Sequence, residues 1–156
     1  MTGSLLKLSA YDEADLQVLS SLLQDSVVPL SDMAFLREER CFALAVSRFR
    51  WEAIGDGVRA QGASASAEPA GERVNCGIRF EGVQRVMMRG IDPGRRDHVL
   101  ELSALHYQDE KIVLLFAGGA MVRLEVDGIL CHLEDFGAPW PTMFRPDHGP
   151  ETSTQD

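Results

Sequence analysis

"HVLELSALHYQDEKIVLLFAGGAMVRLEV", residues 98–126, holds three apolar runs that are separated only by "QDE" and "GG". Runs of this length that are rich in Val, Leu and Ile predict β-strands. Gly118-Gly119 predicts a two-residue hairpin turn, because glycine readily adopts the positive φ angles that such a turn needs. Connections this short can join only antiparallel neighbours, so the stretch predicts an antiparallel meander.

Further strands are predicted upstream of this meander. Residues 5–9 are predicted to form a short first strand. The segment "VVPLSDMAFL" (27–36) is predicted to be extended, because its proline discourages a helix. The segment "VQRVMMRGI" (83–91) is also predicted to be extended. "RVNCGIRF" (73–80) alternates apolar and polar residues, as a half-buried strand does. "CFALAVSRFRWE" (41–52) is predicted to be buried on both faces at first, and then one-sided where arginines alternate with aromatic residues.

Two helices are predicted at the ends of the domain. In residues 12–26, Leu16, Leu19 and Leu23 follow the spacing of one helix face, and Ser9 with Asp12 resembles a capping box. In "DGILCHLEDFG" (127–137), Ile129, Leu133 and Phe136 fall at i, i+4 and i+7, with Gly137 as the expected C-cap. Trp140 and Phe144 are then expected to fold back over that apolar stripe as a terminal clasp, with Trp140 largely buried.

Together these elements predict an α+β fold, with a curled antiparallel sheet of about seven to eight strands, an N-terminal helix and a short C-terminal helix. The length of 156 residues predicts one domain over 1–148, a mobile Gly/Ala/Ser loop at 55–72 and a disordered tail at 149–156. Residues 29–44 and 101–115 echo each other faintly, which raises the hypothesis of an internal duplication.

The net charge of −9 argues against nucleic acid and anionic membranes as partners. The N-terminus has no secretory signal pattern, and the longest apolar run, residues 112–122, is about half of the ~20 residues that span a bilayer. The chain is therefore expected to be cytoplasmic. Cys41, Cys76 and Cys131 are scattered in apolar surroundings, which predicts buried free thiols in a reducing compartment.

The stretch 131–150 gathers two histidines, three acidic residues and a cysteine, which raises the question of a metal site. Cys131, His132, Asp135 and His148 could supply ligands, but their spacing fits no standard zinc site. His132 reads better as a helix-surface residue, so no metal and no cofactor are predicted. We find no phosphate-binding loop, nucleophile elbow or nucleophile–base pair, and we therefore name no catalytic residue.

Four arginines form the one candidate binding site. Arg48 and Arg50 alternate along one strand and are expected to point outward or into a cleft, while Phe49 and Trp51 anchor the other face. Arg85 and Arg89 repeat the arrangement on a later strand. If these strands lie together, the four guanidinium groups could bind a small anion or an acidic partner segment. The alternative is a solvated face on which the arginines pair with the excess Glu and Asp.

Three segments, "LKLSAYDEADLQVLSSLLQDSVVPLSDM" (6–33), "FALAVSRFRWE" (42–52) and "LLFAGGAMVRLEVDGILCHLEDFGAPWPT" (114–142), resemble a proteobacterial family known only as domain of unknown function 2948. The resemblance covers most of residues 5–148. It implies a bacterial cytoplasmic protein, and it brings no activity, ligand or site residue with it.

The absence of a catalytic motif favours a non-catalytic binding or protein-interaction module, whose partner is another protein or a second copy of the chain. The alternative is a small-molecule binder or enzyme with an arginine-lined pocket on the sheet that takes an anionic ligand.

Overall fold

The computed structural model describes residues 5–53 and 71–142, which form one α-helix and ten strands. The helix is α1 (Glu13–Leu23). The strands are β1 (Lys7–Ala10), β2 (Ser26–Pro29), β3 (Met33–Leu36), β4 (Cys41–Phe49), β5 (Gly71–Glu81), β6 (Val83–Arg89), β7 (Val99–Gln108), β8 (Lys111–Phe116), β9 (Met121–Val126) and β10 (Cys131–Thr142). The C-terminal tail and nearly all of the loop at 55–72 lie outside the described residues.

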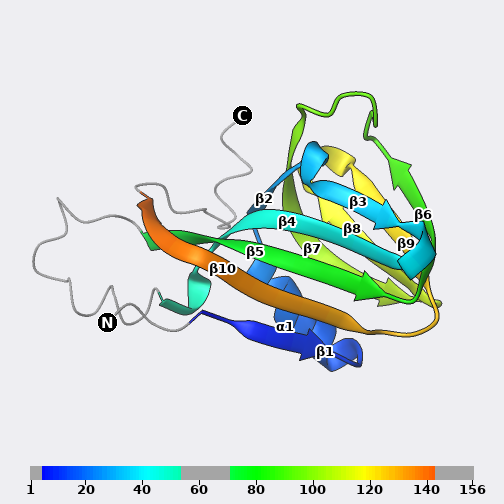
Figure 1. Ribbon diagram of the computed structural model, residues 1–156, viewed down its shortest axis with the longest axis horizontal. Helices are drawn as coiled ribbons and strands as arrows, with labels where there is room; N and C mark the ends of the chain where they lie inside the picture. Colours follow the sequence, from blue (N-terminus) through cyan, green and yellow to red (C-terminus); the bar gives the residue numbers. More distant parts are fainter. Residues whose placement is uncertain (1–4, 54–70, 143–156) are drawn as a thin grey trace, which may run out of the picture.

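All ten strands belong to one antiparallel sheet, in the order β1-β10-β5-β4-β2-β7-β8-β9-β6, with β3 paired to the first half of β4. The sheet curls strongly, so that β6 and β9 come round to face β4 and β5 across the core (Figure 1). Irregular pairing within β6, β7 and β10 contributes to this curl, because bulges bend and twist a strand. The curled antiparallel sheet is confirmed, but the fold is mostly β, with more strands and fewer helices than predicted.

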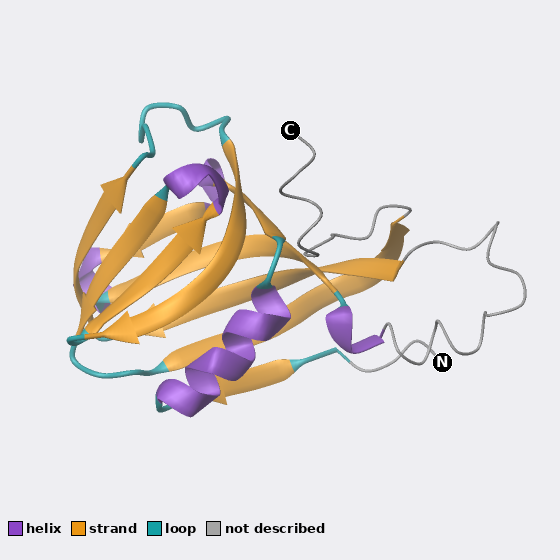
Figure 2. Cartoon of the chain, turned by 180° about the vertical axis from the view of Figure 1, so that it is seen from behind, coloured by secondary structure: helices purple, strands orange, loops and turns teal. Residues whose placement is uncertain are grey.

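The N-terminal helix is confirmed, although it is shorter than predicted. It begins after Asp12, whose side chain accepts a hydrogen bond from the backbone N–H of Asp15 at 2.8 Å. Asp12 therefore caps the helix itself, in place of the capping box expected from Ser9. Leu16, Leu19 and Leu23 are buried as predicted, and α1 packs against β7, β1 and β4 (Figure 2). Among the described residues no helix is long and apolar enough to cross a membrane.

The prediction of a C-terminal helix over 127–137 is wrong, because this stretch enters the long strand β10. Cys131, Leu133 and Asp135 alternate on the buried face of that strand, whereas Phe136 points outward and is 48% exposed. Trp140 is 38% exposed and lies opposite Arg73 on β5, so the prediction that Trp140 is largely buried against a helix is wrong as well. Phe144, the other residue of the predicted clasp, lies outside the described residues. The apolar residues of this stretch fit the helical spacing i, i+4 and i+7, but they also alternate with polar residues as in a strand. The stretch forms a strand because it pairs with both β1 and β5.

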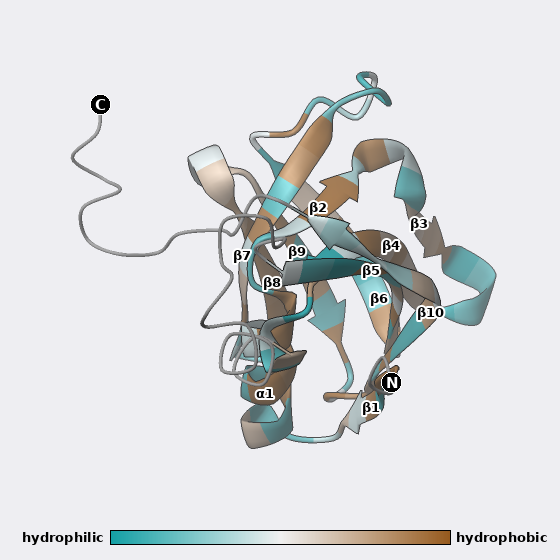
Figure 3. Cartoon of the chain, turned by 90° about the vertical axis from the view of Figure 1, so that its left-hand side faces the viewer, coloured by the Kyte–Doolittle hydropathy of each residue, from teal (hydrophilic) through white to brown (hydrophobic). Residues whose placement is uncertain are grey.

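The core consists of cross-strand rows on the inner face of the sheet. The predicted face of β5, formed by Val74, Cys76, Ile78 and Phe80, is buried as expected. The pairing register extends it into three rows: Phe42–Phe80–Cys131, Leu44–Ile78–Leu133 and Val46–Cys76–Asp135. The first two rows are apolar, and the third ends in a carboxylate. Apolar and polar segments alternate along the strands in Figure 3.

The two short connections of the meander are tight turns. Gly118 and Gly119 have φ angles of 84° and 88°, the positive values that the sequence predicted for the β8–β9 hairpin, but the connection is the 3₁₀ turn η5 (Ala117–Gly119), which is longer than the predicted two-residue turn. The β7–β8 turn uses Asp109 and Glu110, with φ angles of 54° and 62°. Two consecutive positive φ values are typical of a type I′ turn, which matches the twist of the flanking strands. Glutamate is an unusual residue in this conformation, because its Cβ crowds the backbone there.

Candidate functional site

Arg48 lies on the inner face of β4, next to the carboxylate of Asp135 on β10. Its Nε donates to Oδ1 of Asp135 at 2.8 Å, and its Nη2 donates to Oδ2 at 2.7 Å. The same guanidinium donates to both carboxylate oxygens of Glu52, at 2.9 and 2.7 Å. Arg48 is fully buried, and two forked pairs of hydrogen bonds satisfy it.

Asp135 also holds the chain where it enters β1. Its Oδ2 accepts a hydrogen bond from Leu6 N–H at 2.9 Å, and its own N–H donates to the Leu6 carbonyl at 2.9 Å. Burial opposes ionisation of Asp135, but the hydrogen bonds from Arg48 and Leu6 outweigh it and hold the pKa of Asp135 below its ordinary value. Glu52 is affected in the same way: burial is opposed by Arg48, and the net effect lowers its pKa.

Arg50 is also buried, with 4% of its surface exposed. Its guanidinium pairs with Glu72 on β5, and its Nε lies 3.7 Å from Glu52. The prediction that Arg48 and Arg50 point outward or into a cleft is therefore wrong. Phe49 is fully buried as expected and packs edge-on against Trp51 at 4.7 Å, so this end of β4 is covered on both faces.

The other two arginines lie on a different part of the sheet. Arg85 and Arg89 are exposed on β6, on the face that also carries Met87, as the sequence predicted. In the strand order β6 is separated from β4 by β2, β7, β8 and β9. The structure therefore does not gather the four arginines into one site. Anion binding by either pair stays a prediction, and Arg48 has its hydrogen-bond donors occupied within the protein.

The residues considered for a metal site are separated by the pleat of β10. Cys131 points into the core, whereas His132 points outward and its Nδ1 lies 2.8 Å from the hydroxyl of Ser9. His148 lies outside the described residues. Within the described residues no group of three or more His, Cys, Asp or Glu side chains is arranged to hold a metal ion. The three cysteines are free and buried, as predicted.

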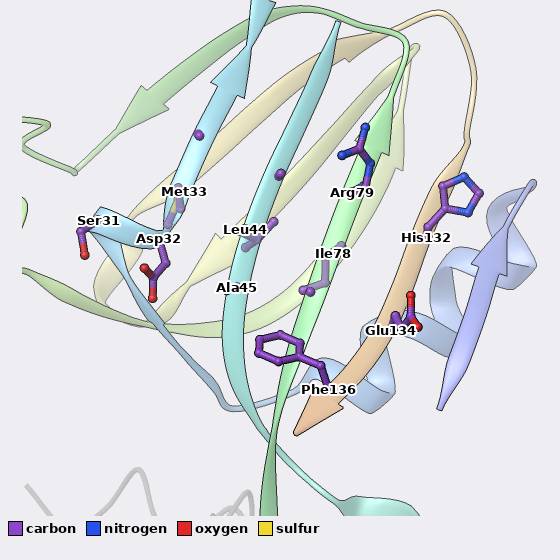
Figure 4. A pocket seen from close by; sticks show the side chains of 13 residues that line it. Ser31, Asp32, Met33, Leu44, Ala45, Ile78, Arg79, His132, Glu134 and Phe136 are labelled. Atoms are coloured by element: carbon purple, nitrogen blue, oxygen red, sulfur yellow. The ribbon is translucent and has the colours of Figure 1, made fainter. Parts of the chain in front are cut away.

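An open groove of about 660 Å³ crosses the outer face of β3, β4, β5 and β10 (Figure 4). Its floor is made of small side chains on neighbouring strands: Ala43 lies opposite Ala34 on β3, and Ala45 lies opposite Gly77 on β5. Ser31 and Asp32, at the turn η1 (Leu30–Asp32) before β3, border one side. The groove exists because the four adjacent outward positions of its floor carry small residues, whereas outward positions around them carry larger side chains.

Phe136 covers part of this floor. Its ring reaches from β10 across β5, and a Cβ built on Gly77 would lie 3.9 Å from it (Figure 4). An aromatic ring over a strand glycine shields the neighbouring backbone hydrogen bonds, which is a structural reason for its position. Phe136 is nevertheless 48% exposed, so it presents apolar surface to solvent at one end of the groove.

Polar and charged side chains form the opposite rim. Arg79 and His132 are cross-strand neighbours on β5 and β10, and Glu134 occupies the next outward position on β10. Arg79 pairs with Glu81 at 3.1 Å and with Glu39 at 3.7 Å, while 47% of its side chain stays exposed. Exposed pairs of this kind are weak, so a ligand could compete for the Arg79 guanidinium.

The sequence pattern did not predict this groove. The available signal was the alternation in "CFALAV" (41–46), where Ala43 and Ala45 alternate with Phe42 and Leu44. Two small outward residues on one strand do not make a depression. The depression needs Gly77 and Ala34 beside them, and those neighbours follow from the pairing register alone.

The same alternation could have placed Arg48. Side chains two residues apart on a strand point to the same face. On β4 the inward residues Phe42, Leu44 and Val46 are therefore followed by Arg48. On β10 the inward residues Cys131 and Leu133 are followed by Asp135. The alternation of Phe49 and Trp51 with the arginines instead favoured the aromatic residues as the inward ones, and the burial of Arg48 contradicts this.

A family model described as a protein of unknown function, DUF2948, matches residues 6–148 of the chain. The match confirms the resemblance seen in the three sequence segments, and its description gives no activity. No curated protein and no solved structure matches the chain.

Proposed function

Because the chain belongs to the DUF2948 family of proteins of unknown function, we propose from its own geometry that it is a non-catalytic binding module. The groove on β3, β4, β5 and β10 is its docking site, and it receives a large apolar side chain of a partner protein. The single observation that carries this proposal is the outward floor of Ala43, Ala45 and Gly77 beside the exposed ring of Phe136.

The shape of the groove favours a protein segment over an enclosed small ligand. Small-molecule sites usually bury most of the ligand within a concave cavity. This groove is open and lies across an exposed sheet face, which suits an apolar residue projecting from a larger surface. The polar rim of Asp32, Arg79, His132 and Glu134 resembles the arrangement of protein interfaces, in which charges surround an apolar centre.

The test is a peptide-library selection on wild-type protein, followed by binding to variants with a filled groove. Ala45→Leu adds volume on β4, and Gly77→Val adds volume on β5 without a close backbone contact. Ala104→Leu on β7 is the matched control, because Ala104 is also half-buried and points outward away from the groove.

We expect the selected peptides to share one large apolar residue. Their affinity should fall by about tenfold or more for Ala45→Leu and Gly77→Val, since burying such a side chain contributes roughly 1.5–3 kcal/mol. Ala104→Leu should bind like the wild type. Equal binding to the filled and unfilled proteins, with melting temperatures unchanged, would contradict the proposal.

A small amphipathic anion is the second candidate occupant, favoured by the neighbouring Arg79 and His132 at the rim. Its carboxylate would meet these two side chains while its apolar part covers Phe136. A thermal-shift screen with aromatic carboxylates tests this candidate: stabilisation that is sensitive to salt and lost in Arg79→Gln would support it. The absence of any shift would leave the partner-protein proposal as the sole use of the groove.

A further inference from the structure

The second feature of interest is β6, which lies at the end of the sheet. It pairs with β9 along one edge. Along its other edge, the described part of the chain provides one backbone hydrogen bond, from Val83 N–H to the Arg40 carbonyl at 2.8 Å. The rest of this edge has no neighbouring strand among the described residues, so its backbone groups can pair with an added strand.

The outer face beside this edge is a regular grid on β6, β9 and β8. The register defines three rows: Arg85–Glu125–Lys111, Met87–Arg123–Val113 and Arg89–Met121–Leu115. Four cationic side chains and one carboxylate share the grid. This is the reverse of the charge balance of the chain as a whole, which has a net charge of −9.

These cations are poorly neutralised within the protein. Arg85 and Arg89 are exposed and form no ion pair with a described residue. Arg123 donates from Nη2 to the sulfur of Met87 at 3.1 Å, a weak acceptor, and its buried Nε has no hydrogen-bond partner. The positive charge is therefore available to a partner, unlike that of Arg48 and Arg50.

We propose that the free edge of β6 binds an extended acidic segment of a partner protein by strand addition. Directly opposed residues of paired strands share one face. An added strand would therefore place acidic residues opposite Arg85 and Arg89, about 13 Å apart at roughly 3.3 Å per residue. Between them, an apolar residue would contact Met87. The recognised pattern is acidic-x-apolar-x-acidic.

Charge decides between this occupant and the two obvious alternatives. If two copies paired through β6 in antiparallel register about Met87, Arg85 would oppose Arg89 of the other copy, and like charges directly opposite each other are destabilising. A single-stranded nucleic acid would need aromatic side chains on which its bases stack, and the grid contains none. An acidic polypeptide satisfies both the backbone edge and the arginines.

The probe is a synthetic peptide with the repeating pattern Glu-Thr-Val-Thr-Glu and blocked ends, and its affinity is measured by fluorescence anisotropy at two salt concentrations. We expect salt-sensitive binding to the full-length chain, with slowed amide exchange along β6 in NMR spectra. Arg85→Glu/Arg89→Glu should weaken binding by about tenfold or more, because two attractive cross-strand pairs become repulsive. Arg37→Glu/Arg95→Glu, which changes the charge equally at exposed sites off the grid, should bind like the wild type.

Two further arms make the result decisive. The same peptide N-methylated at alternate residues keeps its charges but cannot pair with a strand edge, so equal binding by this peptide would overturn strand addition. Absence of binding by the unmodified peptide would overturn the proposal. The role left for the arginines would then be to oppose edge-to-edge association of two copies by charge repulsion. Ala45→Leu, which fills the groove on the other part of the sheet, should leave binding of this peptide unchanged, so the outcome is independent of the proposed function.

Discussion

At the scale of single residues, the buried arginine is the most consequential feature of this protein. A fully buried guanidinium is costly unless carboxylates and hydrogen bonds compensate for its lost hydration. Asp135 and Glu52 provide that compensation from β10 and from the chain just after β4. Asp135 also accepts a hydrogen bond from Leu6 N–H, so its carboxylate connects β10 with β4 and with the residue before β1, three segments that are far apart in sequence.

The first prediction concerns Asp135→Asn, which leaves Arg48 with a weaker partner. We expect the free energy of unfolding at neutral pH to fall by roughly 2–3 kcal/mol, as measured by urea denaturation. Asp97→Asn, at an exposed turn, is the control and should change it by less than about 0.5 kcal/mol. A loss equally small for Asp135→Asn would contradict the structural role of this pair.

The pH dependence gives a second prediction for the same residue. The pKa values of Asp135 and Glu52 are lower in the folded protein than in the unfolded chain. Their ionisation therefore stabilises the fold above the unfolded pKa, near 4, and this stabilisation is lost as the pH falls through the lower folded values. Stability should decrease below about pH 5, with a shallower slope in Asp135→Asn than in the wild type. Identical slopes in acid denaturation would rule out this linkage.

At the scale of elements, the turns of the meander show where local sequence and fold disagree. The β8–β9 turn uses glycines at positive φ, whereas the β7–β8 turn forces Glu110 to a φ of 62°. Asp-Gly is a favoured sequence for such turns, so the chain carries a less suitable residue at this position.

The third prediction follows from that disagreement. Glu110→Gly should raise the free energy of unfolding by about 0.5–1 kcal/mol, because relief of the left-handed strain exceeds the entropic cost of glycine. Glu38→Gly, in the turn η2 (Arg37–Glu39) where no positive φ is required, should lower it. Thermal or urea denaturation measures both, and a destabilised Glu110→Gly would show that the turn gains nothing from glycine.

At the scale of the whole molecule, the three cysteines report on the integrity of the sheet. Cys41, Cys76 and Cys131 lie on β4, β5 and β10, and all three are buried. Burial, with the nearby Asp135 charge, raises the pKa of Cys76 to about 12, and burial raises the pKa of the other two thiols as well. Since the thiolate is the reactive species, these thiols should be inert in the folded protein.

The fourth prediction is that thiol labelling follows global unfolding. With excess reagent near pH 8, mass spectra should contain protein with no label or with three labels, and the rate should match that of unfolding. A population labelled once before the others would show that one of these strands opens separately from the sheet.

The sequence by itself determined the elements whose signals are local. The meander of residues 98–126, the alternating face of β5, the apolar stripe of α1 and the burial of the three thiols all follow from composition, turn residues and periodicity. The family also followed from the sequence, through segments that span most of the chain.

The tertiary structure alone decided the strand β10, the burial of Arg48 and the groove. Residues 127–137 fit a helical stripe and an alternating strand equally well, and pairing with β1 and β5 chose between them. Arg48 can enter the core because Asp135, 87 positions away, meets it there. Ala43, Ala45 and Gly77 become one surface because register aligns them. These outcomes depend on interactions between distant residues, whose free energies no local pattern contains.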